Sequence, residues 1–165
     1  MTTAPHTTAA PPDQLLGEPT AGDMMRTSVV TVDAAELAVM TFALVRRSDH
    51  GIALVFRNGA PAGLVDEYGL HRAALRALLY DAAGDAEATV ASCLPRRCVR
   101  IPVTAALGTV AEHLLRSPIG AALVTDGGTV VGVITVPDLL RALSHPLPRR
   151  RATRTRRAMP APPAG

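Results

Sequence analysis

Lysine is absent from this chain of 165 residues, in which all 17 basic residues are arginine. A phosphate-binding loop lysine, a Schiff-base lysine and the strand lysine of kinases are therefore excluded. No Gly-x-Ser-x-Gly elbow and no His-Glu-x-x-His pair occurs, and the five histidines are scattered along the chain. These absences predict that the protein is not an enzyme.

Aromatic residues and long apolar runs are scarce as well. There is no tryptophan and there are only two phenylalanines and two tyrosines, which disfavours binding of single-stranded nucleic acid through stacked aromatic side chains. Apolar runs such as Val130 to Val136 are far shorter than the roughly 18 residues that a membrane span needs. The first 19 residues lack the basic start and apolar stretch of a signal peptide. We expect a cytoplasmic protein with no membrane contact.

The two cysteines, Cys93 and Cys98, are too few for a metal site of their own. A structural zinc ion needs about four ligands, and no cysteine or histidine partners stand at suitable spacing. We expect both cysteines to be small buried hydrophobic residues, with no metal and no cofactor.

Charge is divided unevenly along the chain. All 14 acidic residues and eleven of the arginines lie before position 146, so this part of the chain has a net charge of −3. The other six arginines lie between 149 and 157. The body is thus acidic and the C-terminal stretch basic. We expect no nucleic-acid binding except a weak association through this basic stretch.

An internal duplication is the main positive signal. Residues 51–73 and 120–142 align at an offset of 69 with nine identities in 23 positions, including three pairs of glycines. Glycines kept in register indicate backbone points where a side chain would not fit. Upstream, the apolar residues Leu37, Met40 and Leu44 align with Leu107, Val110 and Leu114 at an offset of 70, which predicts a one-residue insertion in a connecting loop.

Each copy has the pattern strand, helix, hairpin, helix. Tight-turn sequences, Asn58-Gly59 and Asp126-Gly-Gly128, separate the two strands of each hairpin. The chain is therefore predicted to be an α/β (α+β) protein of two β-α-β-β-α repeats, packed as a pseudo-twofold pair with a shared core and a ligand site between them. We expect these boundaries: a disordered arm (1–19), repeat 1 (20–79), a linker (80–88), repeat 2 (89–145) and a disordered arginine- and proline-rich tail (146–165).

The order of elements, the duplication and the motif Gly132-Val-Ile-Thr135-Val-Pro137-Asp138 together resemble the CBS (cystathionine beta-synthase) domain family, as a stand-alone pair. The resemblance implies that an adenosine-containing ligand such as AMP, ADP, ATP or S-adenosylmethionine binds between the repeats. It implies ligand contacts from Gly132, Thr135, Pro137 and Asp138, with the Asp138 carboxylate accepting hydrogen bonds from the ribose hydroxyls. Arg26, just before the first strand, is a weaker candidate for contacting a phosphate.

The same motif has a structural interpretation. Thr135-x-x-Asp138 with a proline inside the first turn is also a capping box that starts a helix. Repeat 1 has Asp66 and Gly69 at the matching positions and so lacks the ribose carboxylate. We expect repeat 2 to be intact and repeat 1 to be degenerate.

Two functions follow from this sequence. The first is a non-catalytic regulatory module that binds an adenosine-type ligand and acts on an unknown protein partner. The alternative is a dimeric scaffold or protein-interaction module that binds no nucleotide. Both predict a homodimer, because apolar helices left outside the pair need cover.

Overall fold

The computed structural model describes residues 18–80, 88–144 and 157–162. Repeat 1 contains, in chain order, β1 (Val30–Asp33), α2 (Ala38–Arg46), β2 (Ile52–Arg57), β3 (Ala60–Asp66) and α3 (Glu67–Tyr80). Repeat 2 contains the matching elements β4 (Arg100–Pro102), α5 (Leu107–Leu115), β5 (Ala121–Asp126), β6 (Thr129–Thr135) and α6 (Val136–Ser144). The predicted β-α-β-β-α order is confirmed in both repeats. Two short helices, α1 (Ala21–Met24) and α4 (Val90–Cys93), had no counterpart in the prediction. Most of the predicted N-terminal arm and linker lies outside the described residues.

Each repeat forms its own three-stranded sheet, in the order β1-β2-β3 and β4-β5-β6. The first two strands of each sheet are parallel and the last two form an antiparallel hairpin. The hairpin turns need left-handed backbone, which Asn58 (φ 52°) and Gly59 (φ 74°) provide in one repeat and Gly127 (φ 53°) and Gly128 (φ 86°) in the other. The turn residues thus explain why the chain reverses at these two places.

The offset of 69 continues through the whole duplication. Helices α2 and α5 begin 69 residues apart, as do β2 and β5, β3 and β6, α3 and α6, and α1 and α4. Strand pairing follows the same offset, because Thr31 lies opposite Leu54 and Arg100 opposite Leu123. The predicted one-residue insertion is therefore wrong.

The predicted buried face of α2 is wrong for the same reason. Met40 and Leu44 are 62% and 50% exposed, and the buried positions are Ala38, Thr41 and Val45. In α5 the predicted positions Val110 and Leu114 are buried. Seven of the nine α2 residues are apolar, so more than one apolar stripe with helical spacing runs along that helix and the pattern cannot identify the buried one.

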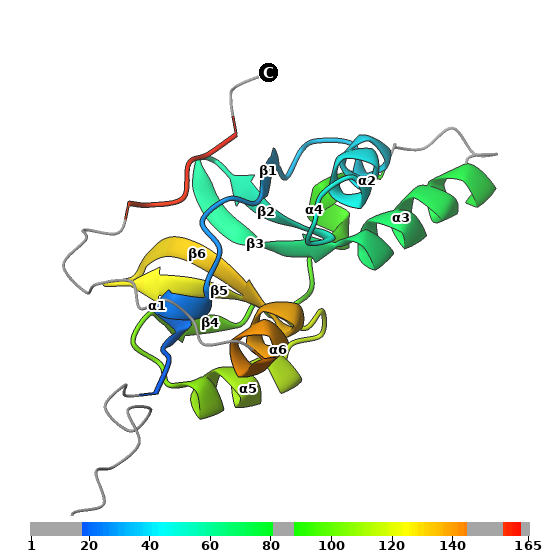
Figure 1. Cartoon of the computed structure of the whole chain (residues 1–165). Coiled ribbons are helices and arrows are strands. Elements are labelled where there is room, and N and C mark those ends of the chain that lie inside the picture. The colour runs from blue at the N-terminus through cyan, green and yellow to red at the C-terminus, as the bar shows by residue number, and fades with distance from the viewer. Residues whose placement is uncertain (1–17, 81–87, 145–156, 163–165) are drawn as a thin grey trace, which may run out of the picture.

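The short helices are exchanged between the repeats. Helix α1, at the start of repeat 1, donates main-chain hydrogen bonds to repeat 2, from Ala21 to Ala105 (2.8 Å) and from Gly22 to Val103 (2.9 Å). Helix α4, at the start of repeat 2, makes the equivalent bonds to Glu36 and Ala34 of repeat 1, both 2.8 Å. Figure 1 shows α1 beside β4 and α6, and α4 beside the sheet of repeat 1.

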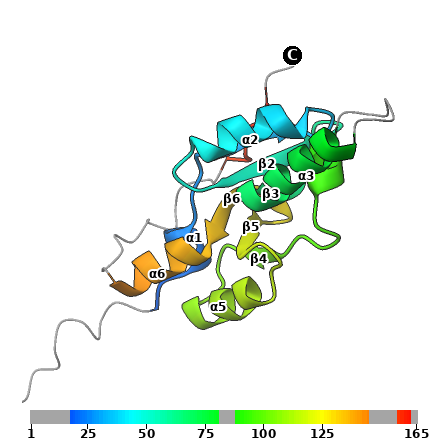
Figure 2. The same ribbon diagram turned by 90° about the vertical axis from the view of Figure 1, so that its right-hand side faces the viewer.

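A shared core joins the two sheets, as predicted. It contains Ile52, Leu54, Phe56 and Leu64 from repeat 1 and Ala121, Leu123, Val130 and Val133 from repeat 2. Full burial of a leucine or isoleucine side chain stabilises a fold by about 1.5–3 kcal/mol, so this layer fixes the repeats against each other. In Figure 2 the two sheets lie next to each other, with α2 and α3 on the far side of one and α5 on the far side of the other.

A C-terminal segment, residues 157–162, lies against this core. Met159 is 6% exposed, belongs to the apolar cluster between the sheets, and donates a main-chain hydrogen bond of 2.9 Å to the carbonyl of Val130. Disorder is predicted from the sequence for the whole stretch 146–165, because the arginines and prolines around Met159 are typical of a solvated tail. The structure differs at 157–162, where a single apolar side chain is buried.

Candidate functional site

Asp138 is a buried carboxylate at the start of α6. It is 4% exposed, and its Oδ2 accepts hydrogen bonds from the Thr135 main-chain N–H (3.0 Å) and the Thr135 hydroxyl (2.7 Å). Pro137 lies in the first helical turn, where its missing N–H costs no hydrogen bond, and its side chain is exposed. The motif therefore begins a helix and also fixes the direction of one carboxylate oxygen.

The second oxygen of Asp138 is bound by two arginines. Arg26 Nε donates to Oδ1 at 2.6 Å, and Arg141 Nη1 donates to the same oxygen at 2.9 Å. Arg26 Nη1 also lies 3.1 Å from His50 Nε2, and because a guanidinium only donates, this imidazole nitrogen is the acceptor. Side chains from both repeats thus converge on Asp138.

Arg26 therefore belongs to the site, but with a different contact from the expected one. The sequence suggested an approach to a phosphate, whereas the guanidinium binds the Asp138 carboxylate. Arg141 and His50 were missed. A basic residue three positions after Asp138 on a helix was a usable signal for Arg141, whereas nothing near His50 in the sequence points to Asp138.

Gly132 has a positioning role. A Cβ at this position would lie 2.6 Å from Met25 Sδ and 2.9 Å from the Arg26 carbonyl oxygen. The absence of a side chain lets the Arg26 backbone pair with Val133 through two hydrogen bonds of 2.8 and 2.9 Å. Gly132 thus allows the approach that brings Arg26 to Asp138.

The equivalent position in repeat 1 contains different chemistry. Asp66 replaces Thr135 and Gly69 replaces Asp138, and Asp66 Oδ1 accepts a hydrogen bond of 2.9 Å from the Gly69 N–H. Pro95, which replaces Arg26, has neither a charged side chain nor an N–H for the bridge to the neighbouring strand. Repeat 1 keeps the helix start but has no carboxylate–arginine pair at these positions.

Other site types find no support among the described residues. No group of three or more histidine, cysteine or acidic side chains is placed to hold a metal ion there. Cys93 and Cys98 are partly buried free thiols, and burial raises the pKa of each above its ordinary value, which keeps them protonated at neutral pH. No helix in the described ranges has the length and apolar character to cross a membrane.

Comparison with known families identifies the second repeat. Residues 90–145 match the CBS domain model, and no match was found among curated proteins. This segment is therefore similar to a CBS domain, and the elements within residues 21–80 follow the same order at an offset of 69.

Solved structures share the fold at low sequence identity. An uncharacterized conserved protein from Pyrococcus horikoshii is 20% identical, with a TM-score of 0.65 over 81% of this chain and 98% of its own. CBSX2, whose structure is a complex with AMP, is 19% identical, with a TM-score of 0.62 over 76% of this chain and 96% of its own. A CBS domain-containing protein from Kribbella flavida is 17% identical, with a TM-score of 0.57 over 76% and 99%. The chain thus has the fold of CBS-domain proteins.

Proposed function

We propose that this chain, a CBS-domain protein, is a non-catalytic regulatory module that binds one adenosine-type ligand at Asp138. The observation that carries the proposal is the buried carboxylate at the start of α6, where side chains of both repeats meet. A carboxylate beside the positive end of a helix suits the two hydroxyls of a ribose, each of which can donate a charge-assisted hydrogen bond. The AMP complex of CBSX2, a protein of the same fold, supports an adenosine-type ligand.

Binding in repeat 2 alone follows from the difference between the repeats. Gly69 offers no carboxylate to a ribose, and Asp66 would repel an incoming phosphate. We therefore expect one ligand for each chain. The output would act on another protein.

Calorimetry with AMP, ATP and S-adenosylmethionine tests this function. The wild-type chain should bind one ligand, Asp66→Ala should retain binding, and Asp138→Ala should lose more than about tenfold in affinity with the loss of a charge-assisted acceptor. Thermal unfolding of each variant shows whether it is folded. Absence of heat from all three ligands with the folded wild-type chain would contradict the proposal.

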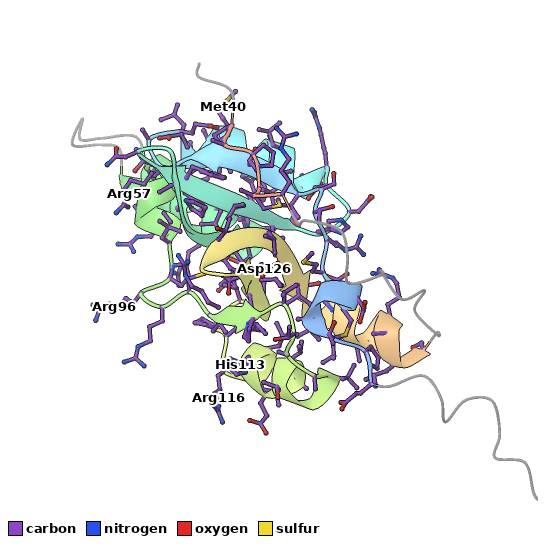
Figure 3. The ribbon with its side chains drawn as sticks, turned by 90° about the vertical axis from the view of Figure 1, so that its left-hand side faces the viewer. Met40, Arg57, Arg96, His113, Arg116 and Asp126 are labelled. Atoms are coloured by element: carbon purple, nitrogen blue, oxygen red, sulfur yellow. The ribbon has the colours of Figure 1, made fainter. Side chains whose placement is uncertain are left out.

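The alternative, a dimeric scaffold without a nucleotide, has its own supporting observation. Apolar side chains are exposed on the adjacent helices of repeat 1, namely Val39, Met40 and Leu44 on α2 and Tyr68, Leu75, Leu78 and Leu79 on α3. Figure 3 labels Met40 at the outer margin of the molecule. This exposed apolar area suits a second copy of the chain, and sedimentation at micromolar concentration should give a dimer that Leu78→Glu dissociates. A wild-type monomer would contradict the homodimer in either function.

A further inference from the structure

The acceptor capacity of Asp138 is fully used by the protein itself. An ionised carboxylate has about four lone-pair directions on its two oxygens. Two hydrogen bonds from Thr135 reach Oδ2, and one each from Arg26 and Arg141 reach Oδ1. A ribose that donates to this carboxylate through both of its hydroxyls must therefore displace two of these donors.

The donors differ in how readily they can leave. Thr135 is buried and its two bonds form part of the helix start, so their loss would disrupt α6. Arg141 is 53% exposed and can turn its guanidinium into water at little cost. Arg26 is 28% exposed and makes the shortest contact, 2.6 Å, so its displacement leaves a partly buried cation without an anion.

The balance of charge then decides which ligand can bind. Asp138 carries one negative charge, and Arg26 and Arg141 carry two positive charges, so the three side chains together are cationic. An uncharged nucleoside removes Arg26 from its carboxylate and offers nothing in return. A 5′-phosphate, attached to the same ribose, supplies the missing anion and can accept two parallel N–H bonds from a guanidinium.

We propose that Arg26 is the specificity residue of this site. It binds Asp138 until a ribose displaces it and then pairs with the ligand's phosphate. The site thus selects adenosine 5′-phosphates and discriminates against adenosine and the sulfonium cation S-adenosylmethionine. This inference rests on the function proposed above and adds the chemical class of the ligand. Pro95, which lies 69 residues after Arg26 and is its counterpart, cannot act in this way.

The test compares AMP, adenosine and S-adenosylmethionine by calorimetry on the full chain. The wild-type chain should bind AMP at least about tenfold more tightly than the other two, which corresponds to one charge-assisted bond pair. In Arg26→Gln, AMP should weaken by about tenfold and adenosine should not weaken, so that the preference disappears. Arg116→Gln is the matched control, because Arg116 pairs with Glu112 on α5.

Each outcome separates this inference from the proposed function. Equal affinities for AMP and adenosine in the wild-type chain, or a preference that survives in Arg26→Gln, would overturn the role of Arg26 while the adenosine site stands. No binding by any of the three ligands would overturn both. A measurement without variants guards against misfolding: added NaCl should weaken AMP binding to the wild-type chain and should not weaken adenosine binding. An equal salt dependence for both ligands would also contradict the inference.

Discussion

Repeat 1 and repeat 2 share one backbone but not one set of polar side chains. The elements follow each other at the same offset, the turns are left-handed at the same places, and each repeat receives a short helix from the other. Asp138 and Thr135 of repeat 2 and Arg26, which packs against them, correspond to Gly69 and Asp66 of repeat 1 and to Pro95, which follows the helix packed on repeat 1. The same packing and turn geometry can thus carry two different sets of polar side chains.

The largest difference in stability between the repeats should come from substituting the equivalent glycines Gly132 and Gly63, which pack against the residues that follow α1 and α4. A Cβ at Gly132 would meet the Arg26 carbonyl oxygen at 2.9 Å, whereas one at Gly63 would meet only the end of the Leu94 side chain at that distance. Because backbone cannot move aside as a side chain can, Gly132→Ala should cost about 3 kcal/mol and Gly63→Ala about 1 kcal/mol. Urea unfolding of both variants measures this difference, and equal losses would contradict it.

The C-terminal segment gives the next effect, because Met159 is buried between the two sheets and its main chain bonds to Val130 of repeat 2. Met159→Ala removes a buried side chain from the layer between the sheets and should lower the free energy of unfolding by about 2 kcal/mol. Leu115→Ala, at a position that is 85% exposed and lies outside the apolar face proposed for the dimer, is the control and should change it by less than about 0.5 kcal/mol. If both changes are neutral in thermal unfolding, the segment does not dock in solution.

Removal of the aspartate at the start of α6 should cost more stability than removal of the aspartate at the start of α3. Asp138→Ala leaves Arg26 without its anion and removes both bonds to Thr135, for an expected cost of about 2 kcal/mol after allowance for the exposure of the arginines. Asp66→Ala removes one capping bond, with an expected cost of about 1 kcal/mol. Chemical denaturation of the two variants should rank them in this order, and the reverse order would show that the arginine contacts do not stabilise the fold.

The smallest predicted effect is a gain. Thr41 is fully buried in α2 and its hydroxyl has no hydrogen-bond partner within the described structure, whereas the matching position of repeat 2 is Val110. Thr41→Val keeps the shape and removes an unsatisfied polar group, so it should stabilise the chain by about 1 kcal/mol. A lower unfolding temperature for this variant would indicate that the hydroxyl is satisfied in solution.

Local signals were enough to predict the repeats but not the contacts between them. The turn sequences gave both hairpins, and the Thr135-x-x-Asp138 spacing gave the start of α6, because both depend on residues close in sequence. The buried face of α2 could not be found in this way, since that helix is apolar on several sides. The pairing of Arg26 with Asp138 spans 112 residues and depends on the exchange of α1, which leaves no periodic trace in the sequence.

Because α1 and α4 are exchanged, the stretch of sequence that is duplicated differs from the stretch that packs into one core. The segment that matches the family model begins at residue 90, with a helix that packs on the other copy. The helix that completes the core of repeat 2 is supplied by residues 21–24. A gene for one copy would therefore encode a chain that can cover its core only by trading helices with a twin. Because both copies lie in one chain, each half receives its helix from the other, and the two halves can carry different polar side chains at the same backbone positions.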